Sequence, residues 1–286
     1  MKRFLYFCIV AALGLYSCSP KNEPDNNTEV KGMLPGKFSI SEDRQVQFSQ
    51  GNLQYQASTK TWRFADKQYN YIGSDNAKIS DTYEGWIDLF GWGTGNNPTL
   101  SSTESSDYLY FIDWGNNTIS TISNGGNKVK FWRTFDTYAW WYLFYKRTNA
   151  DALFGLGSVN GVNGTILLPD DWVLPDGAKF TPSRTKGLVD ENDYMYNSNE
   201  DNYTHNIYTA KQWEIMESAG AVFLPAAGCR WGTYMDFVGT GGSYWTLTHG
   251  GGYDAYYLSY NVNGLSTQSC YGCSTGRSVR LVHYIE

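Results

Sequence analysis

The chain has 286 residues, of which 17% are charged and 17% aromatic, and its formal net charge at pH 7 is −6. This composition, with 30 Gly, 23 Tyr and 11 Trp, indicates a folded, turn-rich protein and excludes an intrinsically disordered chain. The acidic balance, without a basic patch to neutralise phosphates, argues against a nucleic-acid partner. The length fits one large domain or two small ones.

The N-terminus has the pattern of a bacterial export signal. Two basic residues precede an apolar run, residues 4–15, which is too short to span a bilayer and has the length of a signal-peptide core. The sequence Leu-Tyr-Ser-Cys follows at residues 15–18 and resembles the lipobox of bacterial lipoproteins, although Tyr16 replaces the small residue usual there. By that resemblance, Cys18 becomes the acylated first residue of the mature protein, with residues 1–18 as its signal segment.

The segment after Cys18 separates the predicted anchor from the fold. Ser19 is compatible with sorting to the outer membrane in lipoproteins generally, so we predict a lipid-anchored outer-membrane protein of a Gram-negative bacterium, exposed at the surface. Residues 19–33 are polar, contain two prolines and lack periodicity, as expected of a flexible tether. Residues 34–286 are the predicted folded domain. An ordinary secretory peptide cleaved elsewhere is the alternative.

The first third of the domain has the pattern of short strands and long loops. Alternating apolar residues predict strands between Lys37 and Tyr55, around a turn at 49–52, and again over 61–72. Residues 73–128 are rich in Gly, Asn, Ser and Asp, which favours large ordered loops anchored by tryptophans. The glycine-rich sequence at 91–97 is not followed by Lys-Ser/Thr, so it does not predict a phosphate-binding loop.

The middle of the domain contains a predicted aromatic helix and two buried strands. The helix covers residues 137–147 and is capped by Asp136 or Thr137; its many aromatic residues predict burial on several sides. A buried strand at 164–168 is stopped by Pro169. The same strand-to-proline pattern recurs at 221–225.

A second helix is predicted over residues 209–219. Thr209 and Gln212 have the spacing of a capping box, and Gly220 ends the helix. The residues expected to face the core are Trp213, Ile215 and Met216.

The last fifth of the chain, Gly239 to Arg280, combines an apolar skeleton with polar residues. The expected packing positions are Trp245, Leu247, Leu258, Tyr260, Val262, Val279 and Leu281. Within 255–263, a strand period of two separates the packing positions from a second set. That second set consists of Tyr257, Ser259, Asn261 and Asn263. Because Tyr, Ser and Asn are favoured on binding surfaces, this pattern predicts a recognition surface rather than an active site.

Several segments together resemble a family of gut-bacterial lipoproteins. In chain order they are TILLPDDW, TAKQWEIMESAGAVFLPAAGCRWG, GSYWTLT, AYYLSYNVN and GRSVRLV. The C-terminal half of that family has a C-type-lectin-like fold, related to the formylglycine-generating-enzyme group and to the FISUMP domain. The group includes the variable proteins of diversity-generating retroelements.

The resemblance covers about residues 37–283. It implies an α+β, C-type-lectin-like fold, with two helices packed on small antiparallel sheets and with long ordered loops. It also implies that the N- and C-terminal strands pair, which places Phe38–Phe48 near Val279–Tyr284.

The resemblance further implies that residues 229–275 carry a binding function. Transferred position by position, the implied ligand-contacting residues are Cys229, Trp231, Tyr234, Met235, Asp236, His249, Gly250, Gly251, Tyr253, Asp254, Tyr257, Ser259, Asn261, Asn263, Cys270, Tyr271, Cys273 and Ser274. The expected partner is a protein or another cell-surface ligand. A fixed carbohydrate-binding or adhesion lipoprotein and a relative of the formylglycine-type oxidases are the alternatives.

The cysteines give no clear sign of chemistry. If Cys8 is lost with the signal segment and Cys18 is acylated, three remain, so at least one thiol stays unpaired. The spacing of Cys270 and Cys273 fits a local disulfide, two independent surface positions, a redox pair or half a zinc site. Zinc requires two further ligands from a chain with only 3 histidines. We therefore predict no metal, no cofactor, no catalytic residue and no enzyme activity.

The remaining polar and aromatic motifs have structural interpretations. His249 is expected in an exposed glycine-rich loop and His283 in a structural position. The acidic cluster at 190–201 lacks the ordered acids and central glycine of a calcium loop, which favours a solvated loop. Core or loop-anchoring roles are expected for Trp86, Trp92, Trp114, Trp140 and Trp141. One or two of these tryptophans remain candidates for stacking on a sugar.

Overall fold

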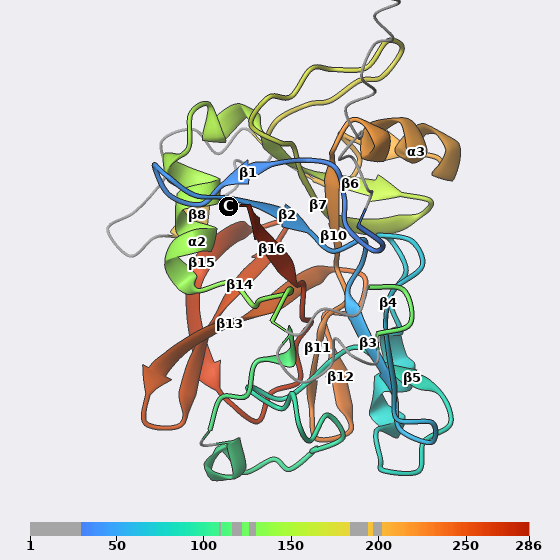
Figure 1. The fold of residues 1–286 in the computed structure, drawn as a ribbon, viewed down its shortest axis with the longest axis vertical. Helices are drawn as coiled ribbons and strands as arrows, with labels where there is room; N and C mark the ends of the chain where they lie inside the picture. The colour runs from blue at the N-terminus through green and yellow to red at the C-terminus, as the bar shows by residue number, and fades with distance from the viewer. Residues whose placement is uncertain are drawn as a thin grey trace, which may run out of the picture.

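The computed structural model describes residues 30–108, 110–115, 122–125, 130–183 and 202–285, together with the backbone of 194–196. The predicted signal segment with Cys18 and most of the acidic cluster at 190–201 lie outside these residues. The described chain is a mixed α+β protein built from small antiparallel sheets and few helices (Figure 1). No helix among these residues is both long and apolar enough to cross a bilayer.

The strands form five sheets, with one parallel pair between β6 and β9. Their bounds are β1 Phe38–Ser39, β2 Gln45–Phe48, β3 Leu53–Gln56, β4 Thr61–Phe64, β5 Trp86–Ile87, β6 Phe154–Val159, β7 Val162–Leu167, β8 Tyr194–Tyr196, β9 Ile207–Tyr208, β10 Val222–Pro225, β11 Cys229–Trp231, β12 Tyr234–Asp236, β13 Gly241–Gly251, β14 Asp254–Asn261, β15 Gly264–Gly272 and β16 Val282–Ile285. The sheet orders are β1-β2-β16, β4-β3-β5, β10-β7-β6-β9, β11-β12 and β13-β14-β15-β8. The helices are α2 Thr137–Trp141 and α3 Ala210–Ser218, with short helical turns at Gly73–Lys78, Ser105–Tyr108, Tyr142–Lys146 and Ala150–Ala152.

The two ends of the domain pair as expected. Strand β16 runs antiparallel to β2, with Val282 opposite Phe48 and Tyr284 opposite Val46 (Figure 1). Val46, Phe48 and Val282 are fully buried. The pairing therefore brings the start and the end of the domain into one hydrophobic core.

The hairpin of β6 and β7 lies in the four-stranded sheet with β9 and β10. The predicted strands at 164–168 and 221–225 correspond to β7 and β10, which pair antiparallel. Strand β6 was not predicted, although its turn is visible in the sequence: Asn160-Gly161 has positive φ angles of 50° and 80°. Asn-Gly between two apolar runs favours this two-residue hairpin turn because both residues tolerate that conformation.

Helix α3 has the predicted start. The Thr209 hydroxyl accepts a hydrogen bond from the Gln212 backbone N–H, and the Gln212 side chain accepts one from the Thr209 N–H. Trp213 and Met216 are buried as predicted, because residues three apart share one helical face. The prediction for Ile215 was wrong. Its side chain is 47% exposed, because it lies on the opposite face from Trp213 and Met216.

Helix α2 begins where the sequence predicts, with Asp136 accepting a hydrogen bond from the Ala139 N–H at 2.6 Å. The α-helix ends at Trp141, and the chain continues in a π-helical turn that closes with the Arg147 N–H donating to the Tyr142 carbonyl. Trp140 is buried, but Tyr138 is 53% exposed. The helical segment, counting the turn at Tyr142–Lys146, therefore has the predicted extent to within one residue, and the predicted burial on several sides does not extend to the face of Tyr138.

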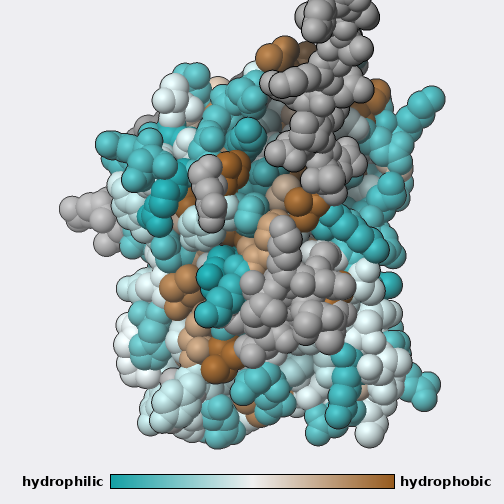
Figure 2. All heavy atoms as spheres, in the orientation of Figure 1, coloured by the Kyte–Doolittle hydropathy of each residue, from teal (hydrophilic) through white to brown (hydrophobic). Residues whose placement is uncertain are grey.

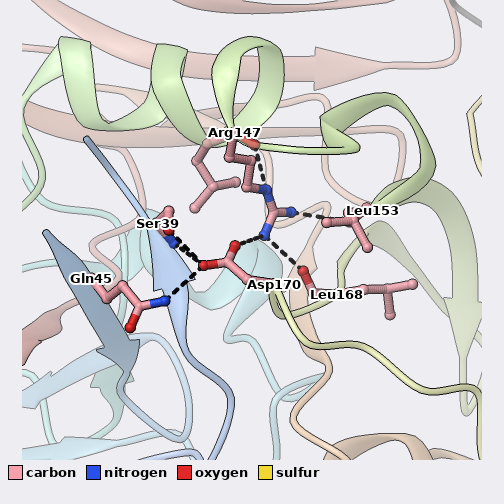
Figure 3. A network of polar contacts seen from close by, with 7 residues as sticks. Ser39, Gln45, Arg147, Leu153, Leu168 and Asp170 are labelled. Carbon is pink, nitrogen blue, oxygen red and sulfur yellow. Dashed lines mark hydrogen bonds and ion pairs between the residues drawn. The ribbon is translucent and has the colours of Figure 1, made fainter. Parts of the chain in front are cut away.

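The guanidinium of Arg147 ties α2 and the turn after it to the first sheet (Figure 3). It donates to the carbonyls of Leu143, Leu153 and Leu168 and to the Asp170 carboxylate, the last at 3.1 Å. The other Asp170 oxygen accepts hydrogen bonds from the Ser39 N–H and hydroxyl and from the Gln45 amide. Burial lowers the pKa of Arg147 to about 10.

Tryptophans anchor the long loops of the first half, as predicted for those parts of 73–128 that the structure describes. Trp92 and Trp114 are buried in the second core cluster with Trp132. The Trp92 indole N–H donates to the Thr246 carbonyl, and the Trp245 N–H donates to the Phe90 carbonyl. These two bonds attach the loops to β13, so a remote segment of chain supports the C-terminal sheet.

Candidate functional site

The sheet formed by β13, β14 and β15 has one buried and one half-exposed face. On β14, Leu258 and Tyr260 are buried as predicted. Tyr257, Ser259 and Asn261 are half-buried and face a hollow at the surface. The period-two pattern therefore separated the two faces of this strand correctly.

Two predicted packing positions were wrong. Leu247 is 38% exposed because a register shift between Trp245 and His249 in the β13–β14 ladder interrupts the alternation. Val262 is 40% exposed because it lies in the turn after β14. Val279, like Leu281, is fully buried, as predicted.

A pocket of about 330 Å³ lies between the β11–β12 hairpin and the half-exposed face of β14. Its lining combines aromatic side chains with small polar ones and exposed backbone. The lining residues are Gly228, Cys229, Trp231, Phe237, Gly241, Gly242, Ser243, Tyr257, Ser259, Tyr260, Asn261, Tyr271 and Arg277. This size and character are typical of a small-ligand or side-chain binding pocket.

The glycines allow two backbones to meet at the base of the pocket. Gly228 forms a bridge to Gly242, and its N–H donates to the Gly241 carbonyl at 2.9 Å. Gly228 has a φ of +77°, and a Cβ added there would lie 2.3 Å from the Asp236 carbonyl oxygen. A side chain at this position would push the end of β12 and the turn after it away from the start of β11.

Arg277 lies at the pocket and is 3% exposed. Its backbone exchanges two hydrogen bonds of 2.9 Å with Phe90, which fix the start of its side chain. The central guanidinium carbon lies 3.4 Å from the ring centroid of Tyr257 and 5.0 Å from that of Trp245. Burial lowers the pKa of Arg277, while Tyr257 opposes that shift. The guanidinium is thus held in place chiefly by aromatic rings.

The predicted ligand-contacting residues fall into several groups. Those that line the pocket are Cys229, Trp231, Tyr257, Ser259, Asn261 and Tyr271. Those outside the pocket lining, on β12 and in β13 to β15 with the turns between them, are Tyr234, Met235, Asp236, His249, Gly250, Gly251, Tyr253, Asp254, Asn263 and Cys270. Cys273 and Ser274 are buried below the surface. Ser274 bonds to Ser105, at 3.1 Å between the hydroxyl oxygens.

Comparisons with protein-family models, with curated proteins and with solved structures found no match for this chain. The site is therefore interpreted from its own geometry.

The sequence-based selection missed four non-glycine residues that line the pocket, one of which, Tyr260, was assigned to packing. Phe237 is 51% exposed and has a φ of 55°, in the turn that follows β12. Ser243 donates its hydroxyl to the Gly228 carbonyl at 3.1 Å. Arg277 was included only as part of the segment that carries the resemblance. That segment contains two arginines, Arg277 and Arg280, and the residue pattern does not distinguish them.

The three cysteines of the described domain are free thiols. Burial raises the pKa of Cys229 to about 11 and that of Cys273 to about 12, and it also raises the pKa of Cys270. Because the thiolate is the reactive form, these cysteines are poorly suited to redox or nucleophilic chemistry at neutral pH. Within the described residues, no group of three or more His, Cys, Asp or Glu side chains has the arrangement of a metal site.

Of the two histidines singled out by the sequence, His283 is in a structural position as expected, and His249 is exposed as expected but lies in β13 and not in a loop. His249 is exposed, and its Nδ1 accepts a hydrogen bond from the Gly251 N–H at 3.2 Å. His283 stacks on Phe131 with a centroid distance of 3.8 Å, which is a structural contact. Neither arrangement indicates catalysis.

A second hollow of about 560 Å³ lies beside α2. Its lining residues are Asp136, Thr137, Tyr138, Trp141, Thr248, Tyr256 and Gln268. Of the tryptophans considered for sugar stacking, Trp92, Trp114 and Trp140 are buried, and the guanidinium of Arg63 lies over Trp86. Trp141 is half-buried and lines this hollow, whereas Trp92 lines another hollow but is buried.

Proposed function

We propose that the protein is a lipid-anchored cell-surface protein that binds a protein or another cell-surface ligand through the face formed by residues 229–275. The observation that carries this proposal is the pocket of about 330 Å³, whose walls include six of the residues selected from the sequence. We further propose that the domain has a C-type-lectin-like fold. The pairing of β2 with β16 and the small antiparallel sheets support that assignment.

Binding rests on a rigid frame with aromatic anchors. Leu258 and Tyr260 are buried on β14 at the centre of this face, and the side chains of Trp231 on β11 and Tyr271 on β15 line the pocket beside it. The rings of these two residues meet edge to face at 6.5 Å between centroids. Large, rigid side chains of this kind provide contact area at a low cost in conformational entropy, as in other recognition surfaces.

A direct test measures binding of the labelled full chain to panels of bacterial and animal cells by flow cytometry. A Trp231→Ala/Tyr271→Ala double variant is expected to lose at least about tenfold in apparent affinity for any cell type that the wild type binds. The matched control is Ile207→Ala/Ile215→Ala, which alters a separate hollow beside α3. The assignment of the face fails if both double variants bind like the wild type.

We also propose that the face is diversified between relatives, as in the variable proteins of diversity-generating retroelements. The exposed residues Tyr234, His249, Tyr253 and Tyr271 can change without altering the core. Sequencing the DNA beside the gene tests this idea. An imperfect repeat of the codons for 229–275 that differs at adenines, next to a reverse transcriptase gene, is the expected result. If no such repeat is found, the residues of this face are not diversified and the proposal of diversification fails.

The alternative is a fixed carbohydrate-binding function, which the hollow beside α2 favours. Trp141 offers an aromatic ring, with the Lys146 amino group 4.9 Å from its centroid, and Asp136 and Gln268 supply polar groups at the same hollow. This arrangement is suited to stacking a sugar ring while bonding its hydroxyls. A glycan array with wild-type and Trp141→Ala protein separates the two functions. Glycan signals that the wild type gives and the Trp141→Ala variant loses would support the sugar site beside α2. An array without any signal from the wild type would contradict it.

The lipid anchor is a separate proposal, carried by the sequence alone. Radiolabelled palmitate fed to cells that express the full chain is expected to label the wild type and not a Cys18→Ala variant. If both proteins are labelled equally, the acyl chain is attached to another residue. If neither is labelled, the proposal of a lipid anchor fails.

A further inference from the structure

Arg277 is a buried cation that the described domain does not neutralise. The ion pairs among the described residues are Arg63–Asp66, Lys67–Glu214, Lys78–Asp75 and Arg147–Asp170, none of which includes Arg277. Its Nε atom is buried and has no hydrogen-bond partner among the residues that the structure describes. Burying a charge without a counter-charge costs free energy. The buried Arg230 and Arg280 also lack an ion pair, but their terminal N–H groups donate to backbone carbonyls and side-chain amides, whereas Arg277 lies against aromatic rings at a pocket.

The surroundings of the guanidinium do not satisfy it. Tyr257 and Trp245 present ring faces, which attract a cation. Burial lowers the pKa of Arg277, and a side-chain hydrogen bond with Tyr257 raises it against that effect. These contacts leave most of its five N–H donors without an acceptor. The nearby Cys229 thiol is protonated at neutral pH, because its pKa is raised to about 11. The open side of Arg277 is the pocket, which it lines with Cys229 and Tyr271.

We propose that the pocket binds a carboxylate of a protein ligand, with Arg277 as the residue that receives it. This inference rests on the binding function proposed above and specifies the chemistry of the same pocket. The planar guanidinium offers paired N–H donors to the two carboxylate oxygens. The rings of Trp231, Phe237 and Tyr271 contact the apolar part of the group that carries the carboxylate.

The other polar groups of the pocket favour a protein ligand over an acidic sugar. The Ser243 hydroxyl already donates to the Gly228 carbonyl, and the Ser259 hydroxyl is 2.7 Å from the Ser269 hydroxyl. The Asn261 side-chain oxygen accepts from the Asn263 N–H at 2.7 Å. A sugar needs a partner for each buried hydroxyl. A carboxylate only accepts hydrogen bonds, so a peptide C-terminus or an acidic side chain needs the cation and few further donors.

The experiment titrates the full chain with two matched probes, N-acetyl-L-phenylalanine and its amide, by isothermal titration calorimetry. The acid is expected to bind at least about tenfold more tightly than the amide, because only the acid forms the charge-assisted hydrogen bonds. N-acetyl-L-glutamic acid α-amide, which carries a side-chain carboxylate, distinguishes an acidic side chain from a chain terminus as the source. Equal affinities for acid and amide, or no heat from any acid at millimolar concentration, would overturn the proposal.

A matched pair of variants tests the location. Cys229→Asp places a carboxylate inside the pocket, where it competes for Arg277, and is expected to abolish the preference for the acid. Ile215→Asp places the same charge in the separate hollow beside α3 and is expected to retain the preference. If both variants keep it, the carboxylate binds elsewhere and the assignment to Arg277 is wrong. The wild-type comparison of acid with amide remains decisive if a variant does not fold.

The same titrations separate this inference from the function on which it rests. N-acetylneuraminic acid binding without binding of either peptide acid would overturn the protein assignment. If cells are bound through the pocket but acid and amide bind equally, the function stands and the carboxylate site fails. If the acid binds selectively but no cell type binds the chain, the carboxylate site stands and the cell-surface function fails.

Discussion

Two buried arginines illustrate different uses of a charge in this fold. Arg147 donates to three backbone carbonyls and to Asp170, so its guanidinium is satisfied by the chain itself (Figure 3). Arg277 lies over the ring of Tyr257, has no carboxylate partner among the described residues, and faces a pocket. The comparison indicates that the first arginine joins structural elements and that the second is kept for a ligand.

The surroundings of the two arginines support the same distinction. Arg147 lies within contacts that connect β1, β2 and the turn after α2 (Figure 3). The pocket of Arg277 is aromatic instead. On the face drawn in Figure 2, hydrophobic residues form small areas separated by hydrophilic and intermediate ones, so exposed apolar surface does not by itself mark a binding site there.

The largest expected effect concerns the satisfied arginine. Asp170→Ala leaves Arg147 buried without its counter-charge and removes the acceptor of Ser39 and Gln45, so the free energy of unfolding should fall by about 3 kcal/mol. Urea denaturation measures this change. Asp171→Ala, at an exposed neighbouring position, is the control and should have little effect. If Asp170→Ala lowers the free energy of unfolding by less than about 1 kcal/mol, Asp170 is not an important counter-charge for Arg147.

Asp88 extends the comparison to a buried carboxylate whose hydrogen bonds come from neutral donors. Burial raises its pKa to about 6, against hydrogen bonds from Asn76 and the Ile72 N–H. The native state therefore binds the proton more tightly than the unfolded chain. Its contribution to the free energy of unfolding is largest below the ordinary value of 3.8 and declines, by up to about 3 kcal/mol, as the pH rises through about 6.

The measurement is urea denaturation of wild type and Asp88→Asn at several pH values between 4 and 7. The wild type should lose stability relative to the variant as the pH rises. A constant difference across that range would mean that Asp88 titrates alike in the folded and unfolded chains.

A smaller effect on stability is expected at the pocket. Arg277→Met removes a buried charge that lacks a carboxylate partner and retains a long side chain against Tyr257 and Trp245. The free energy of unfolding should change by less than about 1 kcal/mol, while binding to cells through the face should be lost. Urea denaturation and flow cytometry together measure both quantities. A loss of stability as large as that of Asp170→Ala would make Arg277 a structural residue.

The smallest expected effect is a difference in reactivity without a change in stability. At pH 8, iodoacetamide should modify Cys270, which is exposed, and leave Cys229 and Cys273 unmodified until urea is added. Peptide mass spectrometry identifies the modified residues. Rapid modification of Cys229 in the folded protein would show that the thiol beside Arg277 is ionised, contrary to the account of this pocket.

Local sequence signals predicted the parts of the fold that depend on neighbouring residues. The capping box of Thr209 and Gln212 and the alternation of Leu258 with Tyr260 involve contacts within one element. Leu247 was assigned to the wrong face because a register shift in β13 does not follow from the residue pattern.

The pocket could be predicted only in part. Period two in β14 identified Tyr257, Ser259 and Asn261 as one face. The role of Arg277 could not be inferred from its position, because its surroundings come from Phe90, Trp245 and Tyr257, which are distant from it in sequence. The tertiary fold decides whether a buried arginine forms an ion pair with a carboxylate.

The most direct test of the central claim is NMR of the arginine side chains in the full chain during titration with N-acetyl-L-phenylalanine. Arg277→Lys and Arg147→Lys variants assign the two Nε–Hε signals. The account predicts that the Arg277 signal shifts saturably while the Arg147 signal stays in place, because only the former lacks a counter-charge. An Arg277 signal that does not move at saturating probe, or an Arg147 signal that moves equally, would contradict it.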